Sequence, residues 1–190
     1  MKRLHNKINK EELKQKMLES NVDRTTLSFY KYALIKDVEK FRNELYRAFE
    51  TIEVFGRIYV SEEGINGQIS VPTKKFKEFK IRLYAIESLD NVRLNIAIDD
   101  NGKSFYLLKI KIRGKIVADG LNDATFDVTN RGVHLNAKGF NELTEDPNTI
   151  VVDFRNHYES EIGHFKGAIT PDVETFRESL PIINEQLQNH

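Results

Sequence analysis

The residues best suited to contact a partner are three cations and two tyrosines on predicted strands. Lys31 lies between Tyr30 and Tyr32, while Arg57 and Lys109 belong to two other predicted strands. Lysine and arginine neutralise phosphates, and aromatic rings stack on unpaired bases. We therefore predict that Lys31, Tyr32, Arg57 and Lys109 form part of a nucleic-acid-binding surface.

Two considerations limit that surface. Successive side chains of a strand point to opposite faces, so Phe29, Tyr30 and Tyr32 cannot all share one face, and at least one of them belongs to the core. A further group of cations lies on a predicted helix, and a lysine-rich helix face is usually only solvated. That group comprises Lys74, Lys75, Lys77 and Lys80.

The segment 62–67 (EEGING) is a second candidate for contact with a ligand. Its glycines permit close approach of the backbone, and Asn66 could hydrogen-bond the edge of a base. The alternative is a plain turn between two strands. Glu63 and Asn66 are therefore candidates for a substrate pocket, with both interpretations open.

Composition excludes several kinds of chemistry. The 190 residues contain no cysteine, which rules out disulfides, thiolate zinc sites, iron–sulfur clusters and thiol nucleophiles within this chain. The histidines show no spacing typical of metal ligands, and we predict no metal. They are His5, His134, His157, His164 and His190.

Charge is distributed unevenly although the total is zero. Residues 1–113 carry 23 basic and 16 acidic side chains, whereas residues 114–190 carry 6 and 13. A cationic first part could bind a polyanion; solvated helix faces would produce the same difference. No stretch approaches the roughly 20 apolar residues of a membrane-spanning helix, and the first residues do not resemble a signal peptide, so we expect a cytoplasmic protein.

Apolar spacing predicts alternating strands and helices over the first part of the chain. Between Val38 and Ile52 apolar residues recur every three or four positions, and Asp37 is a suitable N-cap, which indicates a helix packed on a sheet. The expected order is β-α-β-β-α-β plus one strand, which predicts an α+β, ferredoxin-like domain with both helices on one face of its sheet. The expected elements are helices at 11–20, 38–52 and 73–86 and strands at 25–33, 54–60, 68–71, 92–98 and 105–112.

The second part of the chain predicts a different, incomplete α/β domain. Asn136 could cap a helix to Leu143, and Thr149–Phe154 (TIVVDF) is typical of a parallel strand buried on both faces. Asp172 could cap a last helix to about Leu180. The predicted divisions are an extension at 1–23, a ferredoxin-like domain at 24–113, a linker at 114–131 and the start of an α/β domain at 132–190.

Several segments in the same order resemble the rhodanese-domain tRNA uridine hydroxylases. In the first part they are residues 28–32 (SFYKY), 54–57 (VFGR), 62–70 (EEGINGQIS), 94–97 (LNIA) and 102–105 (GKSF). In the second part they are 153–159 (DFRNHYE) and 162–169 (IGHFKGAI), which resemble the first signature of a rhodanese domain. The similarity covers essentially the whole chain, and it implies that the incomplete second domain is rhodanese-like.

The resemblance implies an enzyme that hydroxylates carbon 5 of the wobble uridine of tRNA with molecular oxygen as co-substrate. It implies a partner, the anticodon arm of tRNA, and a catalytic Cys in a loop beyond His190. On this interpretation the residues shown contain no catalytic side chain, and no bound cofactor is evident in them. A rhodanese-type sulfurtransferase and a non-catalytic RNA- or protein-binding module are the alternatives.

Three residues of the rhodanese-like segments are further pocket candidates. Asp153 and Arg155, in the Asp-x-Arg of the signature, could shape a catalytic pocket at a strand end, although such a pair is more often structural. His164, between Gly163 and Gly167, could act as an acid or base, but a tight loop after the strand is the simpler interpretation.

Overall fold

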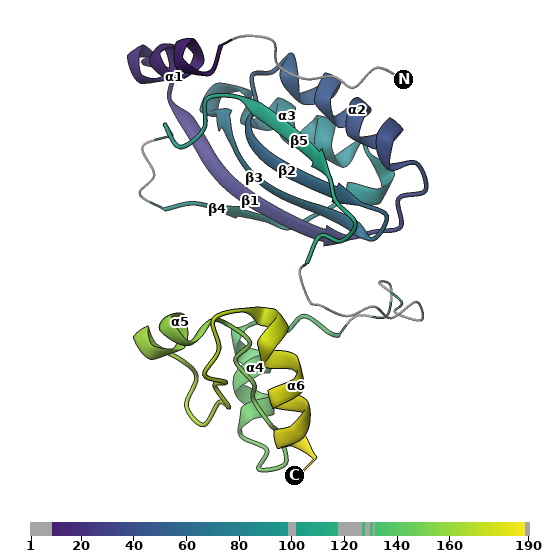
Figure 1. Cartoon of the computed structure of the whole chain (residues 1–190), viewed down its shortest axis with the longest axis vertical. Coiled ribbons are helices and arrows are strands. Elements are labelled where there is room, and N and C mark those ends of the chain that lie inside the picture. The colour runs from purple at the N-terminus through teal and green to yellow at the C-terminus, as the bar shows by residue number, and fades with distance from the viewer. Residues whose placement is uncertain (1–8, 99–101, 118–126, 128–129, 131, 189–190) are drawn as a thin grey trace. The chain divides into compact units, whose positions relative to one another are not determined.

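The computed structural model describes residues 9–98, 102–117, 127, 130 and 132–188 (Figure 1). The chain divides into two compact units, one ending at Ile116 and the other starting at Val117. The first unit contains a five-stranded sheet of order β4-β1-β3-β2-β5. Its strands are β1 (Arg24–Tyr32), β2 (Phe55–Ser61), β3 (Gly64–Pro72), β4 (Leu94–Ile96) and β5 (Leu108–Ile112).

Strand pairing confirms the predicted α+β class and the predicted order of elements. β1 pairs antiparallel with β3 and with β4, and β2 pairs antiparallel with β3. β5 is the exception, because it runs parallel to β2. A β-α-β-β-α-β chain places β1 and β3 in the middle of the sheet, and the extra strand extends it beside β2.

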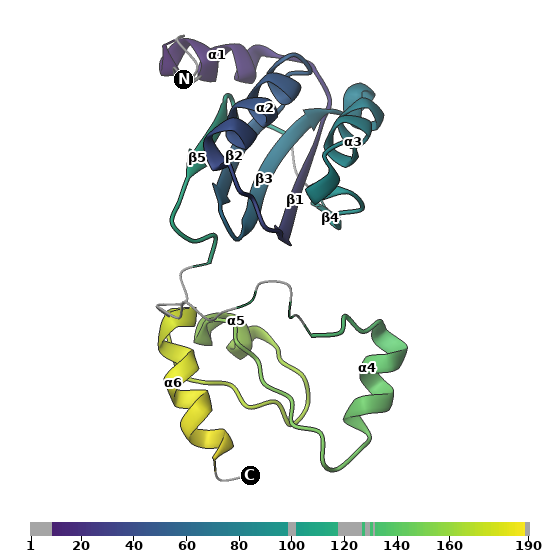
Figure 2. The ribbon, with the colours of Figure 1, turned by 90° about the vertical axis from the view of Figure 1, so that its right-hand side faces the viewer.

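Two helices cover one face of this sheet (Figures 1 and 2). Asp37 accepts a hydrogen bond from the backbone N–H of Lys40 at 2.9 Å, so α2 (Val38–Glu50) begins where its N-cap predicts. Phe49 of α2 and Phe79 of α3 (Phe76–Tyr84) are both fully buried, with ring centroids 5.3 Å apart. Short 3₁₀ segments, η1 (Thr73–Lys75) and η2 (Glu87–Leu89), precede and follow α3, and α1 (Lys10–Glu19) is the predicted polar helix.

The core lies between these helices and the sheet. Most side chains that point toward the helices are apolar and buried, as alternation along a strand predicts; Thr25 and Lys31 at the two ends of β1 are the polar exceptions. The buried apolar side chains include Leu27, Phe29, Ile58, Val60, Ile65, Ile69, Leu108 and Ile110. Phe29 is therefore the core member of the aromatic segment, which leaves Tyr30 and Tyr32 on the opposite face.

Several boundaries differ from the sequence prediction. The segment 62–67, for which a plain turn was one interpretation, is mostly strand, because β2 and β3 are joined through Glu62 and Glu63 alone. Only 94–96 and 108–112 of the predicted strands 92–98 and 105–112 are paired, since pairing depends on partners distant in sequence.

The second unit contains three helices among its described residues. They are α4 (Ala137–Thr144), α5 (His157–Ile162) and α6 (Phe176–Leu187). Asn136 caps α4 as predicted, accepting from the Gly139 N–H at 2.9 Å. Thr175 caps α6 in place of Asp172, with Glu178 completing a capping box.

The predicted buried strand at 149–154 is wrong for the described structure. One parallel bridge joins Val152 to Ile169, and Ile150 and Phe154 are exposed. A parallel strand becomes buried on both faces only when neighbouring strands and helices cover it. The described residues of this unit supply a single bridge, so the apolar run stays partly open. The capping box of Asn156 with Glu159, which starts α5, was not predicted.

Candidate nucleic-acid interface

The face of the sheet opposite α2 and α3 carries two rows of polar and aromatic side chains. In one row Tyr30, Asn66, Tyr59 and Lys111 are successive partners across β1, β3, β2 and β5. In the next row the partners are Ser28, Gln68, Arg57 and Lys109. We call these eight residues the open face. None of the described strand residues on this side of the sheet is acidic.

The open face brings together most of the cations and aromatics predicted to bind nucleic acid. Arg57 and Lys109 are direct partners in the parallel β2–β5 pair. Tyr32 lies next to Tyr30 on the same side of β1, and their rings meet edge to face with centroids 5.2 Å apart. Arginine, lysine and aromatic rings on one exposed sheet are the groups that bind single-stranded nucleic acid.

Lys31 does not belong to this surface, which corrects its grouping with the other three. It pairs with the core residue Ile65 and so points toward the helix-covered face. Its Nζ donates to the carbonyl oxygen of Asp90 at 2.9 Å. The predicted alternation was correct, but Lys31 shares the side of β1 that Leu27 and Phe29 occupy.

Sequence reasoning missed five residues near or on this face, Ser28 among them, and the alternation of side chains along each strand would have identified them. Lys111 lies two residues after Lys109 and therefore on the same side of β5. Tyr59 and Gln68 follow from Arg57 and Asn66 in the same way. Arg113, just after β5, lies with its guanidinium 5.2 Å from the centroid of the Tyr59 ring, a cation–π contact.

Arg24, the first residue of β1, lies at one end of the strands on the same face as the open face. Its Nε donates to Ser70 Oγ at 3.0 Å, and one terminal nitrogen donates to the carbonyl oxygens of Glu53 and Ser70 at 2.6 and 2.8 Å. The guanidinium also lies 4.2 Å from the centroid of the Phe55 ring. Burial lowers the pKa of Arg24 to about 10, so the group stays charged at neutral pH. These contacts make Arg24 a structural cation.

The other end is closed by the turn that contains Glu63. Its carboxylate accepts the backbone N–H of Ile116 at 2.7 Å, and its carbonyl oxygen accepts the N–H of Ala33 at 3.0 Å. Gly64 has φ +150°, and a Cβ there would lie 2.2 Å from the carbonyl oxygen of Lys31. Glu63 therefore fixes the segment that follows β5 through its bond to Ile116, and none of these contacts directs its carboxylate toward a ligand.

The glycines of this segment are required by the protein's own packing, which accounts for them without a ligand. A Cβ on Gly67 would lie 2.5 Å from the ring of Phe29, so glycine makes room for that core side chain. Asn66 has a different environment. It is half-buried on the open face between Tyr30 and Tyr59, where an amide could hydrogen-bond a base.

The second unit contains the other predicted group. Arg155 donates to both carboxylate oxygens of Asp153, at 2.6 to 3.1 Å, and to the carbonyl oxygen of Gly163 at 2.6 Å. The hydrogen bonds from Arg155 hold the pKa of Asp153 below its usual value, helped by the nearby charge of His164. His164 Nδ1 lies 2.8 Å from the carbonyl oxygen of Ser160. The three residues are thus close together, and their contacts close the loop between α5 and Ile169.

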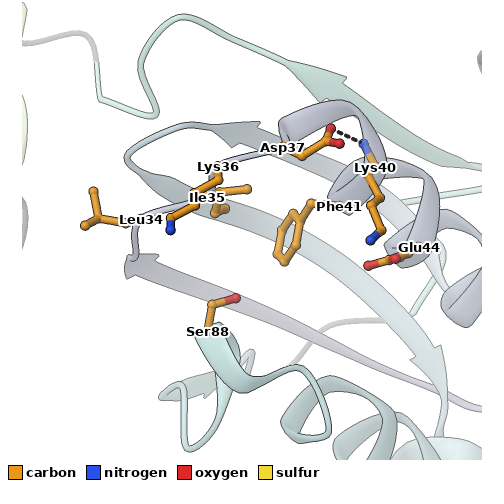
Figure 3. Close-up of a pocket in the computed structure, with 8 residues that line it drawn as sticks. All are labelled: Leu34, Ile35, Lys36, Asp37, Lys40, Phe41, Glu44 and Ser88. Atoms are coloured by element: carbon orange, nitrogen blue, oxygen red, sulfur yellow. Dashed lines mark hydrogen bonds between the residues drawn. The ribbon is translucent and has the colours of Figure 1, made fainter.

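A shallow hollow of about 220 Å³ lies at the start of α2 (Figure 3). Lys36 and Lys40 line it, but Asp37 and Glu44 line it too, so it carries both signs of charge. The carboxylate of Asp37 already occupies the helix N-terminus through Lys40 N–H. The hollow is therefore a weaker candidate for an anionic partner than the open face. Its remaining lining residues are Leu34, Ile35, Phe41 and Ser88.

The described residues contain neither a metal-binding cluster nor a membrane-spanning helix. Among them, no three His, Cys, Asp or Glu side chains gather as a metal site would require. No helix in the described part of the chain has the length and apolar character needed to cross a membrane.

Comparison with known proteins finds similarity to one family model and to several proteins named tRNA uridine(34) hydroxylase. Residues 24–116 match the family model described as the UPF0176 acylphosphatase-like domain. The chain is 50% identical over 188 residues to a tRNA uridine(34) hydroxylase of Photorhabdus laumondii, covering 98% of the chain and 53% of that relative. It is 51% identical to the protein of the same name in Yersinia enterocolitica and 52% identical to that of Yersinia pestis, in each case over 187 residues, 98% of the chain and 53% of the relative.

The chain spans about half the length of the curated relatives it matches. Among solved structures, one titled "BlrB - a BLUF protein, dark state structure" aligns with 48% of the chain and 74% of its own, at 13% identity and a TM-score of 0.35. A likeness that low carries no argument about fold or function.

Proposed function

We propose that the chain is part of a tRNA uridine(34) hydroxylase and that the whole protein hydroxylates the wobble uridine of tRNA to 5-hydroxyuridine, on the strength of its similarity to proteins of that name. The single observation that carries this proposal is identity of 50 to 52% over 98% of the chain. Molecular oxygen is the proposed co-substrate. An enzyme acting on tRNA at this position would work in the cytoplasm on the anticodon arm.

The two units take different parts in this proposal. The first is a ferredoxin-like, acylphosphatase-like domain, supported by its strand order and by the family match to residues 24–116. It holds the anticodon arm through the cationic and aromatic residues of its sheet, Arg57 and Lys109 among them. Delivering a uridine to a pocket requires unstacking it, which costs least in a single-stranded loop.

The second unit is proposed to be rhodanese-like, with a nucleophilic Cys outside residues 1–190. Support comes from its exposed apolar side chains, such as Ile162 and Phe165, which the neighbouring strands and helices of an α/β domain would cover. In this arrangement Asp153, Arg155 and His164 shape the loop beside the pocket without carrying out the chemistry.

The test is the nucleoside content of tRNA from a strain lacking the complete gene. We expect 5-hydroxyuridine at position 34 to disappear and to return with the complete gene, but not with codons 1–190 alone, because those residues contain no cysteine. Unchanged 5-hydroxyuridine together with loss of a thiolated base would replace the proposal by a sulfurtransferase, the usual activity of a Cys persulfide on this fold.

A further inference from the structure

Charge on the open face is confined to one side of it. Lys109 and Lys111 of β5 and Arg57 of β2 lie side by side, and Arg113 follows at the end of β5. On β1 and β3 the open-face residues are uncharged: Ser28, Tyr30, Asn66 and Gln68. A polyanion on this surface therefore meets its counter-charges over β2 and β5 and uncharged groups over β1 and β3.

The uncharged side contains the most accessible aromatic ring. Tyr30 is 39% exposed, whereas Arg113 already lies over the ring of Tyr59. Asn66 is the direct partner of Tyr30 on β3, and its amide offers both donors and an acceptor. A base stacked on Tyr30 would have its edge beside Asn66, as in the recognition of unpaired bases on open sheets.

The spacing of the strands suits one nucleotide laid across them. Tyr30 and Lys111 are separated by three strand spacings, about 14 Å at roughly 4.8 Å each. That distance gives room for a base over Tyr30 with its phosphate directed toward β5. A protein partner is less well matched, because the surface offers it no acidic group and a row of cations.

We propose that single-stranded RNA lies on the open face with its phosphates over β2 and β5 and one base stacked on Tyr30 beside Asn66. The identity of that RNA, the anticodon loop of a tRNA, rests on the proposed function. The arrangement assigns two kinds of role: Arg57, Lys109 and Lys111 bind phosphate without regard to base, and Tyr30 with Asn66 contacts the base.

Separate variants test the two roles in the 190-residue chain. The probe is a fluorescently labelled anticodon stem–loop RNA, and anisotropy gives the dissociation constant at several salt concentrations. Lys109→Gln with Lys111→Gln should reduce the slope of log affinity against log salt by about 1.4, since each phosphate contact on a single strand contributes about 0.7. Tyr30→Ala should weaken binding by about 5- to 100-fold with an unchanged slope, and Tyr30→Phe should restore most of it.

Two matched controls remove one cation each from other places. Lys77 is exposed on α3, on the helix-covered side, so Lys77→Gln should leave affinity and slope as they are. Arg93 is exposed just before β4, which forms the edge of the sheet opposite to β5. Arg93→Gln should therefore also leave the slope unchanged. Circular dichroism and thermal unfolding establish that each variant is folded.

The inference is overturned if the chain does not bind this RNA at low salt, if Arg93→Gln lowers the slope as much as the β5 variants, or if the folded open-face variants bind like wild type. Binding of a protein in place of RNA would overturn it too. The nucleoside test is independent of this one. If the complete protein makes 5-hydroxyuridine but the open-face variants bind RNA normally, only the inference is overturned. If the open face binds RNA but the complete protein makes no 5-hydroxyuridine, only the proposed function is overturned.

Discussion

The two units differ in how completely they bury their apolar side chains. In the first, most of the large apolar residues of α2, α3 and the long strands form one cluster, with Leu45, Phe49 and Phe79 fully buried. In the second, Pro171, Val173 and Ile183 are the buried apolar residues among those described, while Ile162 is 89% exposed and Phe165 59%. The first unit thus has one continuous apolar core, whereas a larger share of the second unit's large apolar side chains is exposed.

Removal of a large core side chain gives the sharpest contrast between the units. Phe49→Ala should lower the free energy of unfolding of the first unit by about 3–5 kcal/mol, since a buried ring is lost and the cavity cannot close. Ile183→Ala should cost the second unit about 2 kcal/mol or less, because its surroundings can collapse. Hydrogen exchange measured by mass spectrometry in a urea series reports each unit separately. Equal losses in both units would contradict the contrast.

A methyl group added at a glycine should give a smaller effect of the same kind. Gly67→Ala should destabilise the first unit by about 1–3 kcal/mol, because the new Cβ would lie 2.5 Å from the Phe29 ring. Gly163→Ala in the second unit has open space around its Cβ and an extended backbone, so we expect no measurable change. Thermal unfolding of the two variants, with Gly114→Ala as the open-space control in the first unit, makes the comparison.

The smallest expected effect concerns the Asp153–Arg155 pair. The folded-state pKa of Asp153 lies below its ordinary value of 3.8, mainly because Arg155 donates hydrogen bonds to its carboxylate. The pair therefore stabilises the second unit above pH 3.8, and this stabilisation is lost as the pH falls through the folded-state pKa. Carbon-detected NMR titration should show the Asp153 pKa rising toward 3.8 in Arg155→Gln. An unchanged pKa would remove Arg155 as its cause.

Local patterns were sufficient to predict the helices of the first unit. Asp37 and the apolar residues from Val38 to Ile52 lie within one short segment, so both the cap and the buried face of α2 can be identified from neighbours in sequence. Strand ends were less predictable, because the parallel pairing of Gly56 with Leu108 joins residues far apart in the chain. Asp172 does not cap α6, because Thr175 with Glu178 three residues later forms the capping box, a pattern already present in the sequence.

The candidate surface was predictable in part, because the alternation of side chains along a strand can be identified from neighbours in sequence. Leu27 and Phe29 indicate which side of β1 is apolar, and Lys31 shares that side, so its exclusion from the open face was already implied by alternation. The partners across the sheet were not implied. That Tyr30 lies opposite Asn66 depends on the β1–β3 register, which only the folded structure supplies.

The strand order also determines how much backbone the first unit leaves unpaired. β1 and β3, nine residues each, are both interior, whereas the outermost strands β4 and β5 have three and five residues. Unpaired N–H and C=O groups at a sheet margin are what recruit a strand from another molecule. With short margins, and with lysines on one of them, this domain offers little template for copies to join sheet to sheet at high concentration.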